Sequence, residues 1–592
     1  MNKSWILLSA WLAACVPAFA APLSIHGEPA VVTKAVVVPK LRLSALASPT
    51  LTLGAVTDAE MAGMTQTHRS SAKRATIGIE RAITMRLPTA GDLQWKSVDG
   101  GSAAQVSIRS PQAGAMRVAI DLAGVPTNVE IVVFGSDNPS RLEGPTRVGD
   151  IPDRTQPWWS PVTDGETQTI EFFAPAGIEG ASLPLRVTGV AHLFTTLASG
   201  LQKRVAEINQ SGMCEIDVKC SSLYPTLAFQ NMRSSVAQMV MNDVDQSGHG
   251  IVILCTGQLL SDTDTTTQIP WFYSANHCFD NEDPPYRTSA QKQTVASTLS
   301  TLWFFEANTC KTPRDTTTPA YVQLNGGSTL IYSDQPSDAL MVRLNGNIPE
   351  GAYFSGWNAT ALPVGAAIFV AHHPEGDLKK VSQGQLVADS MFPGTDATNL
   401  FNEVKYSSGT TEAGSSGAGL FSFDGSEYQL RGALFGGGAA CTSQSSTTAN
   451  TESDWYSQFD KAYPALQPSL SPIGPTFDST DLWWNPNESG WGLNLVQHPS
   501  NQIFGVWFTY SGTGAPTWYT MPGGTWTATN VFSGTVYATT GPSAASATFK
   551  GSSVVVRQAG GATITFNDAN NGTFTYSVDG ASGSKVITRQ PY

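Results

Sequence analysis

The stretch Ser274–Cys278, which reads SANHC, follows the apolar run Ile269–Tyr273 and places a histidine beside a cysteine. Further along, Ser337–Leu344 (SDALMVRL) puts an acid at the head of a strand-like run, and Thr411–Gly417 (TEAGSSG) puts a serine between glycines. The chemically important residues therefore follow one another in the order histidine, aspartate, serine. This order bears directly on the fold, because unrelated folds that use these three residues place them in different chain orders.

A serine, a histidine and an aspartate can together catalyse acyl transfer. A serine hydroxyl is a weak nucleophile, so His277 would remove the proton of Ser416 during attack and later deliver it to the leaving amine. Asp338 would hold the imidazole in the required tautomer and stabilise the imidazolium. Gly414 and Gly417 would let the backbone turn sharply and aim the N–H groups of Gly414 and Ser416 at one point, an oxyanion hole. The order is that of the chymotrypsin fold.

Each signal has a plainer interpretation when it is taken alone. The Gly-Ser-Ser-Gly run could be a flexible loop, His277 could be a packed histidine beside a disulfide, and Asp338 could cap a turn. The conjunction of all three in one order, among the cysteines, favours the catalytic interpretation.

Composition and charge indicate an exported, β-rich protein. Charged residues make up 14% of the 592 residues, and there are 55 glycines; about 25% charged residues is usual in soluble domains. The 47 acidic and 34 basic residues give a net charge of −13. This balance argues against nucleic-acid binding, because phosphate neutralisation needs clustered Lys and Arg.

The first twenty residues indicate export. Lys3 supplies a positive charge, an apolar stretch runs from about Trp5 to Val16, and residues 18–20 (AFA) fit a cleavage pattern. We therefore predict a signal peptide over 1–20 and a secreted protein, extracellular or periplasmic. Residues 12–15 (LAAC) also resemble a lipoprotein cleavage box, so anchoring at Cys15 is the alternative. No later run is apolar and long enough to predict a transmembrane segment.

The remaining cysteines delimit one domain, residues 206–466. An even set in an exported protein suggests three disulfides. The six are Cys214, Cys220, Cys255, Cys278, Cys310 and Cys441. Residues 21–205 lack cysteine and contain alternating runs such as Met116–Leu122, which predict a β-sandwich. Four prolines within Pro464–Pro475 predict a stiff, extended linker over 467–476, followed by an aromatic-rich β domain over 477–592.

Residues of about 211–463 resemble the bacterial lysyl endopeptidases, a secreted branch of the chymotrypsin-like serine peptidases. The matching motifs are Cys214–Cys220 (CEIDVKC), Leu254–Leu260 (LCTGQLL), Ala275–Cys278 (ANHC), Ser337–Asp338, Ala371–Pro374 (AHHP), Thr411–Gly417 and Ser453–Tyr456 (SDWY). The resemblance implies a double β-barrel with the active site between the barrels. It also implies the disulfides Cys214–Cys441, Cys220–Cys310 and Cys255–Cys278. The sequence alone cannot choose this pairing from the fifteen connectivities of six cysteines.

The resemblance places the specificity acid of the family at Asp454. A buried carboxylate there would pair with a cationic P1 side chain, so we expect cleavage after Lys, with Arg as the second choice. The alternative is that Ser453–Asp454 caps a helix beginning at Trp455. Phe435 and Phe392 stand where the family has a stacked His–Trp pair, which puts strict Lys preference in doubt. Gly436 begins a glycine run that suits a substrate backbone lying close by.

The resemblance also bears on activation. Ser415 occupies the position where digestive relatives carry an Asp that receives the new N-terminal ammonium, so activation should not depend on that ion pair. Residues 21–205 would form a pro-region, and Lys203–Arg204, ten residues before Cys214, would suit self-cleavage by a basic-specific enzyme. His372–His373 have no third and fourth ligand at suitable spacing, so we predict no metal and no cofactor.

The C-terminal segment resembles aromatic-rich modules attached to secreted bacterial proteins. Exposed Trp and Tyr could contact carbohydrate or a cell surface; the alternative is that these rings form the core of a small β domain.

Together these features predict an all-β, trypsin-like zymogen: a chymotrypsin-like double β-barrel between an N-terminal β-sandwich pro-region and a small C-terminal β domain. It would be a monomeric serine endopeptidase that acts on proteins or peptides through an acyl-enzyme at Ser416. The alternatives are another P1 preference, or a non-catalytic adhesin that binds surfaces through its C-terminal module.

Overall fold

The computed structural model describes the chain from Leu23 to Pro591, apart from several internal segments. The residues outside this description are 1–22, 32–37, 44–48, 62–71, 197–210, 265–267, 282, 311–319, 392–400, 442–451, 472–476, 499–500, 544, 546–548 and 592. The predicted signal peptide with Cys15, the pair Lys203–Arg204 and Phe392 therefore lie outside the described residues. The chain divides into two compact units, one over Leu23–Leu466 and one that contains Gln467–Tyr592.

A β-sandwich forms the N-terminal part of the first unit, as the alternating runs predict. One sheet contains β3 (Thr50–Thr52), β5 (Lys96–Val98), β6 (Gly101–Arg109), β8 (Glu130–Gly135), β9 (Glu143–Arg147) and β12 (Thr167–Pro175). The other contains β4 (Ala75–Glu80), β7 (Ala115–Asp121), β10 (Trp158–Trp159), β11 (Thr163–Asp164) and β13 (Arg186–Leu193). Val118 and Ile120 from β7 pack with Ile170 and Phe172 from β12 in a fully buried core. Alternate residues of each strand therefore face the opposing sheet.

The first barrel follows the sandwich in the chain. Its strands are β15 (Val236–Val244), β16 (Gly250–Leu260), β17 (Trp271–Ala275), β18 (Ser300–Trp303), β20 (Ser328–Asp334) and β21 (Ala339–Leu344). They pair in the order β18-β15-β16-β17-β21-β20, with β19 (Val322–Leu324) beside β18. A hydrogen bond from Gly327 N to the Leu299 carbonyl, 3.2 Å long, joins the two ends of this order.

The second barrel closes completely. It contains β24 (Ala367–His372), β25 (Lys380–Ser390), β26 (Phe401–Ser408), β27 (Gly419–Phe423), β28 (Tyr428–Gly437) and β29 (Asp454–Tyr456). The pairings run β24-β25-β26-β29-β28-β27 and return to β24. Two six-stranded barrels in sequence are the chymotrypsin-like architecture that the sequence predicts.

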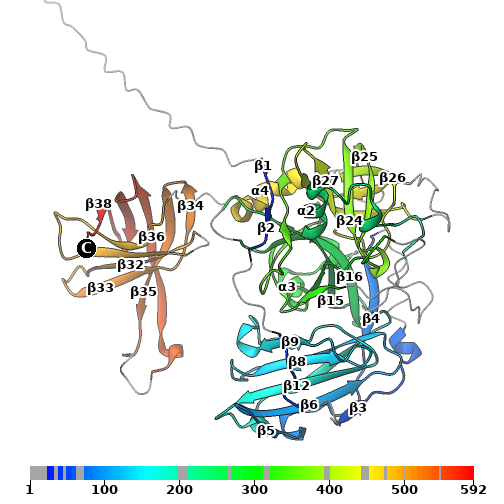
Figure 1. Ribbon diagram of the computed structural model, residues 1–592. Coiled ribbons are helices and arrows are strands. Elements are labelled where there is room, and N and C mark those ends of the chain that lie inside the picture. The colour runs from blue at the N-terminus through cyan, green and yellow to red at the C-terminus, as the bar shows by residue number, and fades with distance from the viewer. Residues whose placement is uncertain are drawn as a thin grey trace, which may run out of the picture. The chain divides into compact units, whose positions relative to one another are not determined.

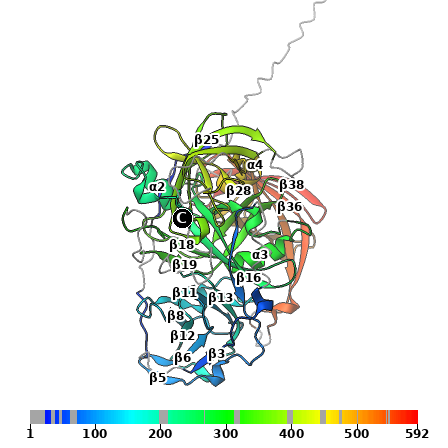
Figure 2. The same cartoon turned by 90° about the vertical axis from the view of Figure 1, so that its right-hand side faces the viewer.

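Strand β4 connects the sandwich to the first barrel. It pairs antiparallel with β13 on one side and with β16 on the other, with Ala75 opposite Leu254. Figure 1 shows β4 (blue) rising out of the sandwich alongside the green strands of the barrel, and Figure 2 gives the side view of the same sheets. The sandwich and the barrel therefore share one continuous sheet, and the N-terminal region is held directly against the first barrel.

Short elements complete the first unit. Strand β1 (Ser24–Ile25) pairs with β23 (Trp357–Asn358), β2 (Glu28–Pro29) with β22 (Tyr353–Phe354), and β14 (Ile216–Asp217) with β25. Two helices, α2 (Leu227–Ser235) and α3 (Ser289–Ser297), begin at the N-caps Thr226 and Thr288. None of the helices in the described part of the chain has the length and hydropathy needed to cross a lipid bilayer.

The expectation of an extended proline-rich linker is wrong at its beginning. Helix α4 covers Phe459–Leu470 and includes Pro464 and Pro468. Both prolines lie on the exposed face, whereas Tyr463 and Leu466 are buried, with the Tyr463 ring 4.8 Å from that of Trp357. A proline costs about 3 kcal/mol inside a helix, and burial of several large apolar side chains at roughly 1.5–3 kcal/mol each offsets it.

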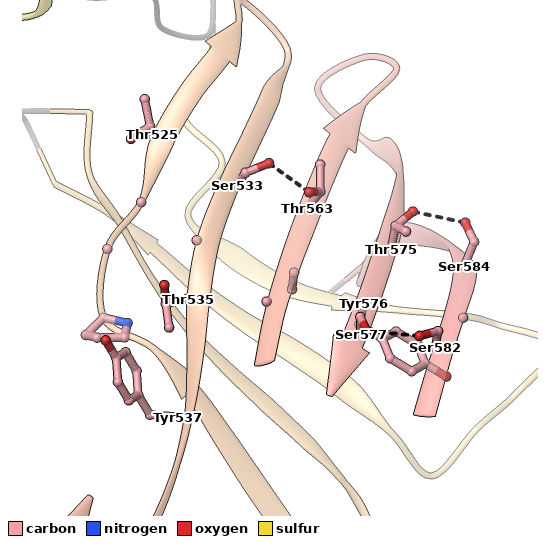
Figure 3. Close-up of a pocket in the computed structure, with 17 residues that line it drawn as sticks. Thr525, Ser533, Thr535, Tyr537, Thr563, Thr575, Tyr576, Ser577, Ser582 and Ser584 are labelled. Atoms are coloured by element: carbon pink, nitrogen blue, oxygen red, sulfur yellow. Dashed lines mark hydrogen bonds between the residues drawn. The ribbon is translucent and has the colours of Figure 1, made fainter. Parts of the chain in front are cut away.

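The second unit is a small β domain built on one continuous sheet. Its strands are β30 (Asp481–Trp484), β31 (Gly492–Gln497), β32 (Ile503–Tyr510), β33 (Pro516–Met521), β34 (Thr525–Ala528), β35 (Val531–Thr540), β36 (Val555–Phe566), β37 (Asn571–Val578) and β38 (Ala581–Arg589). Pairing of β33 with β35 closes it. Figure 3 shows an open pocket on this domain with cross-strand hydroxyl pairs, Ser533 with Thr563 and Thr575 with Ser584.

Aromatic residues of the second unit divide between core and surface. Trp483 is fully buried and Trp526 is 7% exposed. These two rings therefore belong to the core of the β domain, which was the alternative to a surface-binding role. Trp518 and Phe508 face each other across β33 and β32 and are 54% and 50% exposed. The domain therefore has both an aromatic core and an outward aromatic face.

Candidate active site

Three side chains from three loops meet between the barrels. His277 lies in the short helix Asn276–Cys278 that follows β17, Asp338 directly precedes β21, and Ser416 precedes β27. The His277 Nδ1 atom is 2.8 Å from Asp338 Oδ2, and its Nε2 atom is 2.6 Å from Ser416 Oγ. All three residues are at most 4% exposed. This continuous chain of hydrogen bonds is the arrangement that activates a serine hydroxyl.

Backbone hydrogen bonds fix the acid against the histidine. The backbone of Asp338 is in the left-handed region, with φ 53°, which aspartate tolerates better than most residues. Asn276 N donates to its carbonyl at 3.0 Å, and His277 N donates to Asp338 Oδ1 at 2.9 Å. The disulfide Cys255–Cys278 anchors the histidine loop to β16. The imidazole is therefore held from both sides before any substrate binds.

The loop that carries Ser416 presents two converging N–H groups. Gly414 and Gly417 have φ values of 90° and 81°, which favour glycine. Gly414 N and Ser416 N both donate to one oxygen, the carbonyl of Lys73, at 2.6 and 3.1 Å. Two preorganised donors aimed at one carbonyl oxygen form an oxyanion-hole geometry.

Ser415, which precedes Ser416 in this loop, is fully buried. Its Oγ atom is 2.8 Å from His372 Nδ1, and His372 Nε2 is 3.1 Å from Ser382 Oγ. Burial lowers the pKa of His372 to about 3, so this ring is neutral at physiological pH. His373 Nδ1 in turn is 3.1 Å from the Asp377 carbonyl. Both histidines are thus engaged with protein groups in the interior.

A buried carboxylate, that of Asp454, binds the side-chain ammonium of Lys73. Asp454 is fully buried in β29, and the Lys73 ammonium contacts its two carboxylate oxygens at 2.7 and 2.8 Å. Tyr406 Oη donates to the same carboxylate at 3.1 Å, and Thr411 Oγ1 does so as well. The Lys73 ammonium also contacts the Ala439 carbonyl at 2.6 Å and the Thr411 carbonyl at 2.9 Å. Several oxygen acceptors therefore converge on a single ammonium.

The alternative role of Asp454 as a helix cap is wrong. Asp454 belongs to strand β29, which pairs with β26 and β28, and the next helix begins only at Phe459. Pairing on both sides holds these residues in the extended conformation, so no helix begins at Trp455.

The electrostatics of the pocket suit a buried cation. Burial lowers the pKa of the Lys73 ammonium, and the Asp454 carboxylate opposes this shift, with smaller contributions from Glu215 and Glu412. A buried ammonium is stable only when such a partner compensates for its lost hydration.

An aromatic wall borders the histidine. The Phe435 ring centroid is 5.5 Å from that of His277 at 74° and 5.4 Å from that of Phe401. Gly436 forms an antiparallel bridge with Ala72. The sequence indicated Phe435 and Gly436, but Phe401 and Tyr406 carried no signal, because they reach the site only through the closure of the second barrel.

The three disulfides join the pairs that the resemblance implies. They are Cys214–Cys441, Cys220–Cys310 and Cys255–Cys278. Lys73 was the hardest residue of the site to predict from the sequence, since it lies 381 positions from its partner Asp454. The only available signal was a basic pair, Lys73–Arg74, directly before a strand-like run.

Comparisons with known proteins identify relatives of this chain. The family model for the C-terminal domain of lysyl endopeptidase matches residues 208–457, and that for its N-terminal domain matches residues 52–194. A lysyl endopeptidase of Pseudomonas aeruginosa is 30% identical over 386 residues, which are 64% of this chain and 78% of the relative. Crystal structures of a protease from M. tuberculosis in active and inactive forms are 14% and 13% identical. They cover 46% and 44% of this chain and 92% and 98% of theirs, with TM-scores of 0.26 and 0.25.

Proposed function

The chain belongs to the lysyl endopeptidase family and is a peptidase, and we propose that it cleaves peptide bonds after lysine through Ser416, His277 and Asp338. The observation that carries the proposal is the ammonium of Lys73 against the buried Asp454, with the Lys73 carbonyl between Gly414 N and Ser416 N. A lysine side chain and its own carbonyl thus fit the pocket and the oxyanion hole together.

The proposed mechanism follows from the hydrogen bonds. Ser416 Oγ attacks the lysyl carbonyl while His277 Nε2 accepts its proton, and Asp338 stabilises the resulting imidazolium. Gly414 N and Ser416 N stabilise the negative charge that develops on the carbonyl oxygen. His277 then protonates the leaving amine, and a water molecule activated by the same ring hydrolyses the acyl-enzyme.

We expect lysine to be preferred over arginine. The acceptors around Asp454 converge on one compact ammonium, and the carbonyls of Ala439 and Thr411 complete the shell at 2.6 and 2.9 Å. A guanidinium is longer and planar, and its donors form a rigid fork that requires differently placed acceptors. These closely spaced oxygen acceptors therefore support a preference for lysine, although the chain lacks the stacked His–Trp pair of the family.

The catalytic assignment is tested with the serine itself. Wild-type protein should hydrolyse peptides that contain a single lysine and should incorporate a fluorophosphonate at Ser416, whereas Ser416→Ala should lose both activities. Ser415→Ala is the matched control, because its hydroxyl contacts His372 rather than the substrate site; it should still incorporate the fluorophosphonate. Labelling at another residue, or undiminished hydrolysis by Ser416→Ala, contradicts the proposal.

We further propose that the protein is secreted and acts as a monomer. The three disulfides suit an oxidising compartment. The outward face with Phe508, Tyr510 and Trp518, which are 50–55% exposed, supports contact of the C-terminal domain with sugar rings or a cell surface. Binding of the full chain to insoluble cell-wall material, lost in Trp518→Ala, would test this contact, and equal retention of both proteins would contradict it.

A further inference from the structure

The active site is occupied by the chain itself, through the residues that precede β4. We propose that Ala72–Ala75 is an inhibitory segment that binds in the orientation of a substrate, with Lys73 in the P1 position and Arg74 in the P1′ position. The inference rests on the proposed function, and it names the means by which the precursor keeps that function silent. The sequence predicts control by removal of the N-terminal region, with self-cleavage at Lys203–Arg204, and the inference adds the segment through which that region occupies the site.

The contacts on the acyl side are those of a bound substrate. The Lys73 ammonium pairs with Asp454, and its carbonyl accepts from Gly414 N and Ser416 N. One residue earlier, Ala72 bridges antiparallel to Gly436, at the glycine run along the pocket. Side chain, carbonyl and backbone therefore all use the positions that a substrate needs, and no substrate can enter while they are filled.

The contacts on the leaving side are equally ordered. Arg74 donates from Nη1 to the carbonyls of His277 and Asp280 at 3.1 and 2.9 Å. Ala75 then begins β4 and pairs with Leu254 of β16. The chain thus runs across the catalytic serine from Gly436 on one barrel to β16 on the other, as a cleavable peptide would.

The anchoring of β4 explains why this segment inhibits rather than leaves. If Ser416 Oγ attacks the Lys73 carbonyl, the C–N bond to Arg74 breaks, an ester forms, and the serine proton passes through His277 to the Arg74 amine. The amine remains in place, because β4 is paired with both β13 and β16 and buries Ile77 and Ile79 at 1% exposure. It can therefore attack the ester and restore the peptide bond, which keeps the site occupied.

Lys73 should be the residue on which this occupation depends. It is 7% exposed, and its ammonium makes contacts with Asp454, Thr411 and Ala439. A neutral side chain at this position leaves the Asp454 carboxylate buried without its partner, which favours exchange of the segment for water or substrate. The rest of β4 keeps its hydrogen bonds, so the sandwich stays attached.

The test measures access to Ser416 in the full-length chain. Unprocessed protein is treated with a fluorophosphonate immediately after refolding, and a denaturing gel separates the full-length band from shorter products. The variants are Lys73→Met, which keeps an apolar stem, and Lys73→Ala. The matched control is Lys96→Ala, which changes an exposed lysine of the same sandwich in β5. Circular dichroism melts verify that each variant is folded.

We expect the full-length bands of wild type and Lys96→Ala to label at least tenfold more slowly than that of Lys73→Met. The inference is overturned if the full-length wild-type band labels as fast as the Lys73→Met band. Failure of the proposed function gives a different result: no band labels in any protein, processed wild type included, and lysyl peptides stay intact. The inference is also overturned if Lys73→Met and Lys73→Ala, both folded, label as slowly as wild type; the smaller alanine is included because the methionine side chain can still fill the pocket.

Discussion

Replacement of Asp454 by asparagine should abolish the proposed preference for lysine while leaving the proposed triad in place. The carboxylate is fully buried and lies 2.7 Å from the ammonium that occupies the pocket. Asparagine has nearly the same shape but no charge, so a lysine that enters the variant pocket is a buried cation without its counterion. Loss of one partner of a buried ion pair costs roughly 3–5 kcal/mol.

The free energy lost with the ion pair lowers the rate of hydrolysis after lysine. Because each 1.36 kcal/mol corresponds to a factor of ten, kcat/KM for a lysyl peptide should fall by roughly 10²–10³ or more. The assay compares two peptides that differ only at P1, lysine in one and methionine in the other, with processed wild-type and variant enzyme. Both proteins should hydrolyse the methionyl peptide slowly, and its kcat/KM should differ by only a few-fold between them.

Two controls separate specificity from damage. Asp283→Asn removes an exposed carboxylate of the same unit and should leave both peptides unaffected. Fluorophosphonate labelling of Ser416 should proceed in Asp454→Asn at close to the wild-type rate, because the probe does not need the cation pocket. If Asp454→Asn retains the wild-type ratio of lysyl to methionyl hydrolysis, the assignment of the pocket is refuted.

Further predictions concern the oxyanion loop and the buried histidine. In Gly414→Ala the new Cβ would lie 2.7 Å from Leu254 Cδ2 and 2.8 Å from the His373 carbonyl; kcat should fall about a hundredfold with little change in KM. Gly248 also has a positive φ, but a Cβ atom added there would have no atom within 4 Å. Gly248→Ala should therefore be fully active in stopped-flow or steady-state assays. Equal kcat values for the two variants would contradict the role of Gly414 in the oxyanion hole. Burial lowers the pKa of His372 from 6.5 to about 3. Between pH 6.5 and pH 3 the unfolded chain therefore binds one more proton at this residue than the folded chain does. The stability that the folded protein has above pH 6.5, where the ring is neutral in both states, is lost as the pH falls toward 3. Denaturant unfolding should therefore show a difference between wild type and His372→Gln that narrows from pH 7 to pH 4, and a constant difference would contradict the neutral ring.

The local part of the proposed site could be predicted from the sequence because each residue of the proposed triad lies in a short motif. His277 sits beside a cysteine after a strand, Asp338 heads a strand, and Ser416 lies between glycines. Their roles needed only residue chemistry and chain order. Asp454 was different, because its place in the pocket came from family resemblance and not from any local pattern.

Long-range contacts account for what the sequence missed. Lys73 and Asp454 are far apart in the chain, and no periodicity relates a residue before β4 to a strand of the second barrel. Tyr406 and Phe401 reach the site only because β26 closes beside β29. The helix over Phe459–Leu470 was missed for a related reason: its prolines indicated an extended chain, and only the packing of Tyr463 on Trp357 shows what offsets them.

The most direct test of the central claim is the cleavage specificity of the processed enzyme on a protein library. Peptides from a complex protein digest are identified by mass spectrometry, and the residue before each new N-terminus is counted. The proposed function predicts that lysine precedes most of these termini, with few after arginine, and that Ser416→Ala produces none above background. Termini distributed without regard to lysine, or the same termini with Ser416→Ala, would contradict it.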